Sequence, residues 1–81
     1  MSMQQIIVYG TSWCPDCRRS LRVLEQNKAP YQYVNIEEDE QAAAYVVQVN
    51  QGNRSVPTIV FPDGTVLVEP SNAILTQKLV G

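Results

Sequence analysis

The sequence predicts a small α/β domain with the element order β-α-β-α-β-β-α, in which three helices flank a four-stranded mixed sheet. Two observations carry this prediction. Short apolar runs rich in β-branched residues alternate with longer segments whose apolar residues recur at helical spacing. The turn sequence Pro62-Asp63-Gly64 joins the last two apolar runs and predicts a hairpin. Residues 1–81 are expected to form a single domain, since 81 residues suffice for only one core.

The first strand and the first helix are predicted on either side of a turn. Residues 5–9 form a short β-branched run, which Gly10-Thr11-Ser12 ends. Pro15 suits the first turn of a helix that extends to about residue 27. An apolar stripe of this helix is expected to face the core: Cys17, Leu21 and Leu24. Its charged residues are expected in solvent: Arg18, Arg19, Arg22 and Glu25.

Residues 31–36 are predicted as a second strand, parallel to the first because a helix connects the two. The four acids at 37–40 precede apolar residues at helical spacing. We therefore interpret them as the acidic start of a second helix rather than as an acidic interaction tail. Tyr45 in this helix is expected in the core, and Gly52-Asn53 is expected to end the helix.

The last third of the chain is predicted to form a hairpin and a closing helix. Residues 58–61 and 65–69 are the expected strands, on either side of the turn at 62–64. Ser71 is expected to cap the final helix, whose apolar stripe holds Ile74, Leu75 and Leu79. Three basic residues are interpreted as solvated surface: Arg22, Lys28 and Lys78.

Charge and the N-terminal residues exclude several classes of partner. Six basic residues against eight acidic ones give a net charge of -2, so neither nucleic acid nor a membrane is an expected partner. Residues 1–5 lack a basic segment and lead into only four apolar residues, too few for a signal peptide or a membrane span. We expect a cytoplasmic monomer. In that reducing compartment a cysteine pair is catalytic or metal-binding rather than a permanent bridge.

The feature that carries chemistry is Cys14-Pro15-Asp16-Cys17, which holds both cysteines of the chain at the start of the first helix. Two thiols at this spacing can reach each other and form a disulfide reversibly. A helix N-terminus favours a thiolate, because unpaired N–H groups and the positive end of the dipole stabilise an anion. Cys14 is therefore the expected nucleophile, exposed beside Trp13. Cys17 lies on the buried stripe and is the expected resolving thiol.

The charged neighbours of the pair are expected to tune it. Asp16 places a negative charge in the first helical turn and should disfavour a thiolate at Cys14. Arg18 and Arg19 are expected to offset that charge in part.

The sequence resembles the glutaredoxin family of the thioredoxin superfamily, and above all its mycoredoxin-type bacterial members. The likeness rests on Thr11-Ser12-Trp13-Cys14, on residues 52–58 (Gly-Asn-Arg-Ser-Val-Pro-Thr) and on Glu69-Pro70-Ser71. It implies a thioredoxin-like fold and a cis peptide bond before Pro57. It also implies the reduction of protein disulfides and of mixed disulfides between proteins and a low-molecular-weight thiol, which is mycothiol or glutathione. This thiol would be the reducing cosubstrate, and no bound cofactor or metal site is expected.

The resemblance further implies substrate-binding residues. Val56 and Pro57 are expected to pair through their backbone with the peptide-like part of the thiol. The remaining candidates are Trp13, Pro15, Arg54, Ser71 and Asn72. Arg54 is expected either to bind a carboxylate of the thiol or to cap the second helix, and Trp13 either to stack on substrate or to pack.

Glutathione-using relatives carry a lysine where this chain has Gly10 and Thr11, and an aromatic residue where it has Asp16. They also carry a Gly-Gly pair near residues 69–72, which this chain lacks. These departures make mycothiol a competitor of glutathione.

Three other functions stay open from the sequence. One is an electron donor to ribonucleotide reductase, reduced by thioredoxin reductase. Another is an iron–sulfur or metal carrier in which the cysteine pairs of two chains share the ion, since one chain has no histidine or third cysteine to complete a zinc site. The last is a redox-sensing interaction module.

Overall fold

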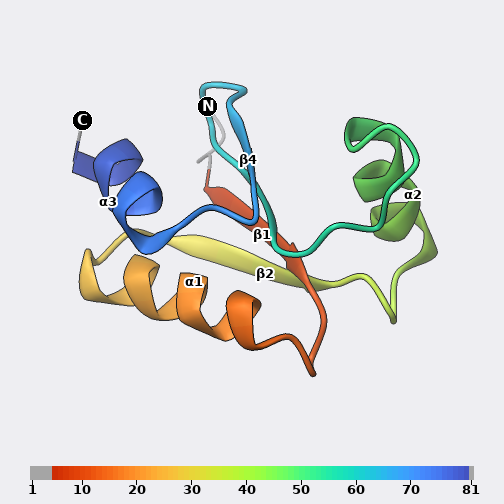
Figure 1. The fold of residues 1–81 in the computed structure, drawn as a ribbon, viewed down its shortest axis with the longest axis horizontal. Helices are drawn as coiled ribbons and strands as arrows, with labels where there is room; N and C mark the ends of the chain where they lie inside the picture. The colour runs from red at the N-terminus through yellow and green to blue at the C-terminus, as the bar shows by residue number, and fades with distance from the viewer. Residues whose placement is uncertain (1–4, 81) are drawn as a thin grey trace.

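The computed structural model describes residues 5–80 and confirms the predicted order of elements (Figure 1). The strands are β1 (Ile6–Gly10), β2 (Tyr31–Asn35), β3 (Thr58–Val60) and β4 (Val66–Val68). The helices are α1 (Pro15–Gln26), α2 (Glu40–Val49) and α3 (Asn72–Val80). Most of the N-terminal segment used in the signal-peptide argument lies outside the described residues. In the described part, every helix is too short or too polar to cross a bilayer.

The sheet is mixed, as predicted, and its strand order is β2-β1-β3-β4. Strands β1 and β2 run parallel, with Gly10 opposite Asn35. Strand β3 is antiparallel to β1 and to β4, and its first residue, Thr58, faces Tyr9. The end of β1, the end of β2 and the start of β3 therefore meet at one edge of the sheet. The loops at this edge bring distant parts of the chain together.

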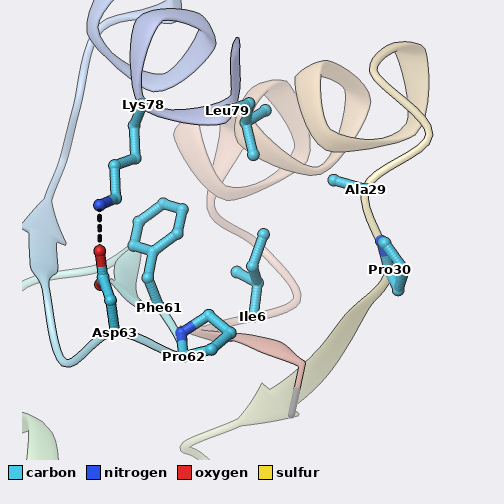
Figure 2. A pocket seen from close by; sticks show the side chains of 8 residues that line it. All are labelled: Ile6, Ala29, Pro30, Phe61, Pro62, Asp63, Lys78 and Leu79. Carbon is cyan, nitrogen blue, oxygen red and sulfur yellow. Dashed lines mark hydrogen bonds and ion pairs between the residues drawn. The ribbon is translucent and has the colours of Figure 1, made fainter. Parts of the chain in front are cut away.

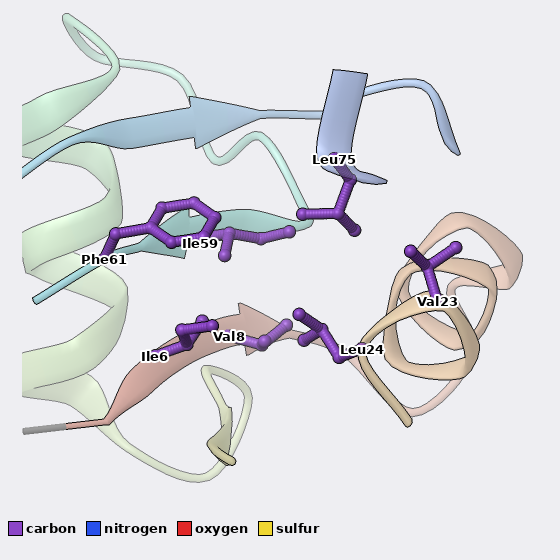
Figure 3. Close-up of a cluster of buried hydrophobic side chains, with 7 residues drawn as sticks. All are labelled: Ile6, Val8, Val23, Leu24, Ile59, Phe61 and Leu75. Atoms are coloured by element: carbon purple, nitrogen blue, oxygen red, sulfur yellow. The ribbon is translucent and has the colours of Figure 1, made fainter. Parts of the chain in front are cut away.

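Alternate residues of β1 face two different helical layers. Ile6 and Val8 point into the main core, which α1 and α3 cover (Figure 3). Tyr9 faces the other side and packs against α2, which lies apart from α1 and α3 in Figure 1. The main core consists of Ile6, Val8, Val23, Leu24, Ile59, Phe61 and Leu75.

The buried face of α1 differs from the predicted stripe. Cys17 and Leu24 are buried as expected, but Leu21 is only partly buried, while Ser20 and Val23 are fully enclosed. The reason is that α1 packs against α3 as well as against the sheet, which widens and rotates its buried face.

The helix ends follow the predicted capping pattern. Asp39 accepts the N–H of Ala42 at 3.0 Å and caps α2, so this acid does serve the helix N-terminus. Ser71 accepts the N–H of Ile74 at 3.1 Å and caps α3. Helix α2 ends at Val49, and Gly52 follows with a φ of 102° in the left-handed region that favours glycine.

Tertiary contacts correct the expected exposure of two residues. Lys78 is not a solvated residue: its Nζ lies 2.6 Å from Oδ2 of Asp63 and 5.3 Å from the ring centre of Phe61 (Figure 2). The helix–hairpin packing brings these residues together although they are far apart in the chain. Tyr45 is half-buried rather than fully in the core, and its ring centre lies 5.2 Å from that of Tyr9.

Candidate functional site

The cysteine pair lies at the edge of the sheet where three loops meet. Cys14 is the N-cap of α1, just after β1. The Ile36 N–H donates to the Gly10 carbonyl at 3.0 Å, which holds the loop after β2 against the end of β1. On the other side, Val56 and Pro57 precede β3, and the peptide bond between them is cis, as predicted. This arrangement places a proline-containing loop beside the first cysteine.

Cys14 is less accessible than the sequence suggests. The expectation of an exposed nucleophile is wrong, because the residue is only 4 % exposed. Its sulfur accepts the backbone N–H of Cys17 at 3.1 Å, and its thiol lies 4.0 Å from the carbonyl oxygen of Val56. The thiol form can donate to this carbonyl, and the thiolate form receives the N–H at the positive end of the helix.

Cys17 is buried one turn further along α1, with 1 % of its surface exposed. Its sulfur packs against Gly10, where a β-carbon would come within 2.7 Å of it. Burial, followed by the hydrogen bond with Cys14, raises the pKa of Cys17 to about 12. Cys17 therefore remains a protonated thiol at neutral pH, and the two cysteines differ in their hydrogen bonds rather than in exposure.

Tyr33 belongs to the same site, although sequence reasoning did not select it. Its ring edge would lie 3.1 Å from a β-carbon at Gly10, so the tyrosine and Cys17 are neighbours across the glycine. Burial raises the pKa of the Tyr33 phenol, and the charges of Cys17 and Cys14 raise it further. The available signal was the parallel pairing of the strands, because Tyr33 pairs with Val8, two residues before Gly10.

Trp13 is 64 % exposed, as the predicted short loop requires, and its indole Nε1 donates to Oε2 of Glu37 at 2.8 Å. Glu37 lies in the loop after β2, although we interpreted it from the sequence as part of the acidic start of the second helix. The structure assigns that role to Asp39 and Glu40 instead, and brings Glu37 to the site.

A cavity of about 310 Å³ opens beside the loop that precedes Cys14, although neither cysteine is among its lining residues. Its lining residues come from all three loops: Thr11, Trp13, Ile36, Glu37, Arg54 and Val56. Thr11 is 4 % exposed, and its hydroxyl has no hydrogen-bond partner within residues 5–80. Arg54 is exposed, and no described residue forms a hydrogen bond or ion pair with its guanidinium. The alternative of Arg54 capping α2 is not realised, because Asn50 occupies the C-cap of that helix.

The opposite side of the cysteine motif contacts α3. Asp16 lies 3.3 Å from Arg19, whose guanidinium also donates to Oδ1 of Asn72 at 2.6 Å. Arg19 is therefore half-buried and paired, not free in solvent as predicted. Arg18 instead donates to the carbonyl of Ser12 at 3.0 Å. Of the two predicted arginines, only Arg19 pairs with Asp16.

The predicted substrate-binding residues thus fall into separate groups. Trp13, Arg54 and Val56 line the cavity, and Pro57 is buried beside it. Pro15 is exposed at the start of α1. Ser71 and Asn72 lie at the start of α3, where their side-chain oxygens accept from Ile74 and Arg19. Within residues 5–80, no three side chains of the metal-binding types cluster together.

A larger cavity of about 510 Å³ lies elsewhere, beside Ile6, Phe61 and Leu79 (Figure 2). Ile6 begins β1 and Gly10 ends it, so this cavity is about 13 Å from the cysteine edge along the strand. The smaller cavity is the one near the cysteine pair, because the carbonyl oxygen of its lining residue Val56 lies 4.0 Å from the Cys14 sulfur.

Comparison with known proteins identifies the family of the chain. A protein of Mycobacterium tuberculosis strain H37Rv with a provisional glutaredoxin name is 44% identical over 75 residues, which cover 93% of this chain and 89% of that protein. Mycoredoxin 1 of Corynebacterium glutamicum is 38% identical over 77 residues, which cover 95% of each. The crystal structure of a glutaredoxin from Archaeoglobus fulgidus superposes with a TM-score of 0.77 at 25% identity, covering 99% of this chain and 90% of that one. The family description Glutaredoxin matches residues 6–67, and the chain therefore belongs to the glutaredoxin family.

Proposed function

We propose that this protein is a cytosolic thiol–disulfide oxidoreductase that reduces mixed disulfides between proteins and a low-molecular-weight thiol. The observation that carries the proposal is the chemical difference between its two cysteines. The Cys14 sulfur accepts an N–H at the start of α1, while Cys17 is held as a buried thiol with a pKa of about 12. Membership of the glutaredoxin family supports this chemistry.

In the first step, the thiolate of Cys14 attacks one sulfur of the mixed disulfide. The disulfide bond breaks, the protein leaves as a thiolate that takes a proton from water, and Cys14 becomes disulfide-bonded to the small thiol. The N–H of Cys17 and the helix N-terminus stabilise the attacking anion. The neighbouring Val56 carbonyl and the cis Pro57 limit the directions from which the disulfide can approach the Cys14 sulfur.

The second step follows one of two routes. A second small thiol can attack the intermediate as a thiolate, which releases the symmetric small-thiol disulfide and returns Cys14 to its reduced form. Alternatively, Cys17 loses its proton and attacks Cys14, which expels the small thiol and leaves a Cys14–Cys17 disulfide. An external dithiol or small-thiol reductant then returns two electrons.

The first step itself prepares Cys17 for the second route. Two of the causes that raise the pKa of Cys17 are its hydrogen bond with Cys14 and the charge of Cys14. Both disappear when Cys14 is part of a disulfide, and the causes that still raise the pKa of Cys17 are burial and the charge of Asp16. The resolving thiol is thus protected against premature reaction and becomes more acidic when it is needed.

The small thiol of this proposal is mycothiol or glutathione. The likeness to Mycoredoxin 1 favours mycothiol. Where glutathione-using relatives carry a lysine, this chain has Gly10, which packs against Cys17, and Thr11, which is buried. Neither residue is a cation. Arg54 is the one cationic side chain among the cavity-lining residues and is the candidate partner for an anionic group of the thiol.

The test compares wild type, Cys14→Ser and Cys17→Ser on a protein thiolated with mycothiol and on the same protein thiolated with glutathione. Cys14→Ser must lose all activity. Cys17→Ser should retain removal of the small thiol and lose reduction of protein disulfides. Retained activity in Cys14→Ser would overturn the proposal, and the ratio of kcat/KM between the two thiols identifies the preferred one.

A further inference from the structure

The hydrogen bond between Trp13 and Glu37 joins two of the three loops that line the cavity beside Cys14. Trp13 follows β1 and Glu37 follows β2, so the bond spans the ends of two adjacent parallel strands. The donor and acceptor are 2.8 Å apart, a normal length for a bond to a carboxylate. The reaction proposed above does not use this hydrogen bond.

The two partners are held to different degrees. The backbone N–H of Glu37 donates to Oδ1 of Asn35 at 2.9 Å, and the preceding Ile36 is tied to Gly10. The Trp13 side chain is 64 % exposed, so packing restrains it little. The Glu37 carboxylate therefore supplies the restraint that selects one orientation of the indole.

The orientation of the indole matters because Trp13 is one wall of the cavity. Val56 is another, and its carbonyl oxygen lies 4.0 Å from the Cys14 sulfur. Thr11, also in the lining, has an unpartnered and buried hydroxyl. A buried hydroxyl of this kind needs a partner, which a polar group of a docked molecule can supply.

We propose that Glu37 is a positioning residue that holds the Trp13 indole as a wall of this cavity, and that the small thiol docks against this wall beside Cys14. The inference rests on the proposed function, because it takes the cavity as the place where the small thiol lies during transfer. Glu37 does not contact either sulfur. Loss of its carboxylate should therefore weaken docking of the thiol and leave the chemistry at Cys14 intact, which raises KM and spares kcat.

The kinetic test uses four variants and the small thiol preferred in the assay above. In Glu37→Ala, KM for that thiol should rise roughly three- to ten-fold while kcat stays within about two-fold. Glu37→Gln should retain most of the wild-type KM, because its amide oxygen can still accept the indole N–H. Trp13→Phe should match Glu37→Ala, and the double variant should be no worse than either. Glu38→Ala is the matched control on the neighbouring acid and should leave KM unchanged.

A second measurement reports on the bond without any activity. Trp13 is the only tryptophan of the chain, so its fluorescence reports on this site alone. In Glu37→Ala, acrylamide should quench it more strongly and its anisotropy should fall, with an unchanged far-UV circular dichroism spectrum. Absence of thiol transfer by the wild type would overturn the proposed function and the docking role with it. Unchanged fluorescence and KM in Glu37→Ala, with transfer intact, would overturn this inference alone.

Discussion

The sulfur of Cys17 packs against the bare backbone of Gly10, at a place where a β-carbon would come within 2.7 Å of the sulfur and 3.1 Å of the Tyr33 ring. The glycine is the last residue of β1, and the cysteine lies in the first turn of α1. The missing side chain at the strand end is therefore what allows the Cys17 sulfur to lie between helix and sheet.

Substitution of Gly10 by alanine should displace this sulfur. We expect Gly10→Ala to lower the free energy of unfolding of the reduced protein by about 1–3 kcal/mol, the usual cost of overpacking a core. Urea denaturation at pH 7 measures it. The control is a double-mutant cycle with Cys17→Ala, which removes the sulfur. Gly10→Ala should lower the free energy of unfolding by less in that background, and an equal loss would show that the contact with the sulfur is not the cause.

The raised pKa of Cys17 should make the stability of the reduced protein depend on pH. Between the ordinary value of 9.0 and about 12, the folded protein keeps this proton and the unfolded chain releases it. Stability is thus fully present below pH 9 and falls as pH rises through this window, by at most roughly 1.4 kcal/mol per pH unit. Urea unfolding at pH 8, 9, 10 and 10.5 measures the slope.

Above pH 10, three tyrosines with raised pKa values should also lower the free energy of unfolding: Tyr9, Tyr31 and Tyr33. The comparison with Cys17→Ser isolates the cysteine, because the tyrosines are common to both proteins. Cys17→Ser should show the shallower slope between pH 9 and 10.5, and identical slopes would contradict the assignment.

The Asp16–Arg19 pair should tune the reactivity of Cys14. Asp16→Asn removes a negative charge from the first turn of α1, so alkylation of Cys14 by iodoacetamide at pH 7 should become about two- to five-fold faster. Arg19→Gln should slow alkylation, because it leaves Asp16 without the guanidinium 3.3 Å away. Mass spectrometry of the modified peptide gives the rate for Cys14 separately.

The double variant Asp16→Asn with Arg19→Gln is the decisive comparison. If Arg19 acts by neutralising Asp16, its substitution should have little effect once the acid is gone. A full effect in that background would point to its contact with Asn72 instead. Glu25→Gln, near the far end of the same helix, controls for a general change in charge.

The Asp63–Lys78 pair should contribute stability that acid removes. Hydrogen bonds from Lys78 and from the Thr65 backbone hold the pKa of Asp63 well below its ordinary value of 3.8. The contribution is present above that value and is lost as pH falls below it. Asp63→Asn should therefore lower Tm by at most a few degrees at pH 7, with a gap to wild type that narrows below about pH 4. Disulfide reductase activity should be unchanged, since Asp63 follows the end of β3, whereas the cysteines lie near its start.

Local sequence patterns predicted most of the fold. Apolar periodicity located the seven elements, Ser71 caps the last helix as predicted, and Asp39 and Glu40 of the four acids at 37–40 lie at the start of α2. The cysteine pair was recognised from the four-residue motif at 14–17, and these features depend on residues close together in the chain, which is why they can be recognised without a structure. The cis peptide bond before Pro57 was instead implied by the family resemblance.

Contacts between distant segments needed the tertiary structure. The burial of Cys14, the approach of Tyr33 to Cys17, and the pairing of Trp13 with Glu37 all arise at the edge where β1, β2 and β3 meet. Strand register and helix packing decide which side chains meet there, and neither can be derived from the local periodicity of apolar residues. The sequence was therefore sufficient for the elements and the reactive motif, whereas packing decided how buried each sulfur is and what surrounds it.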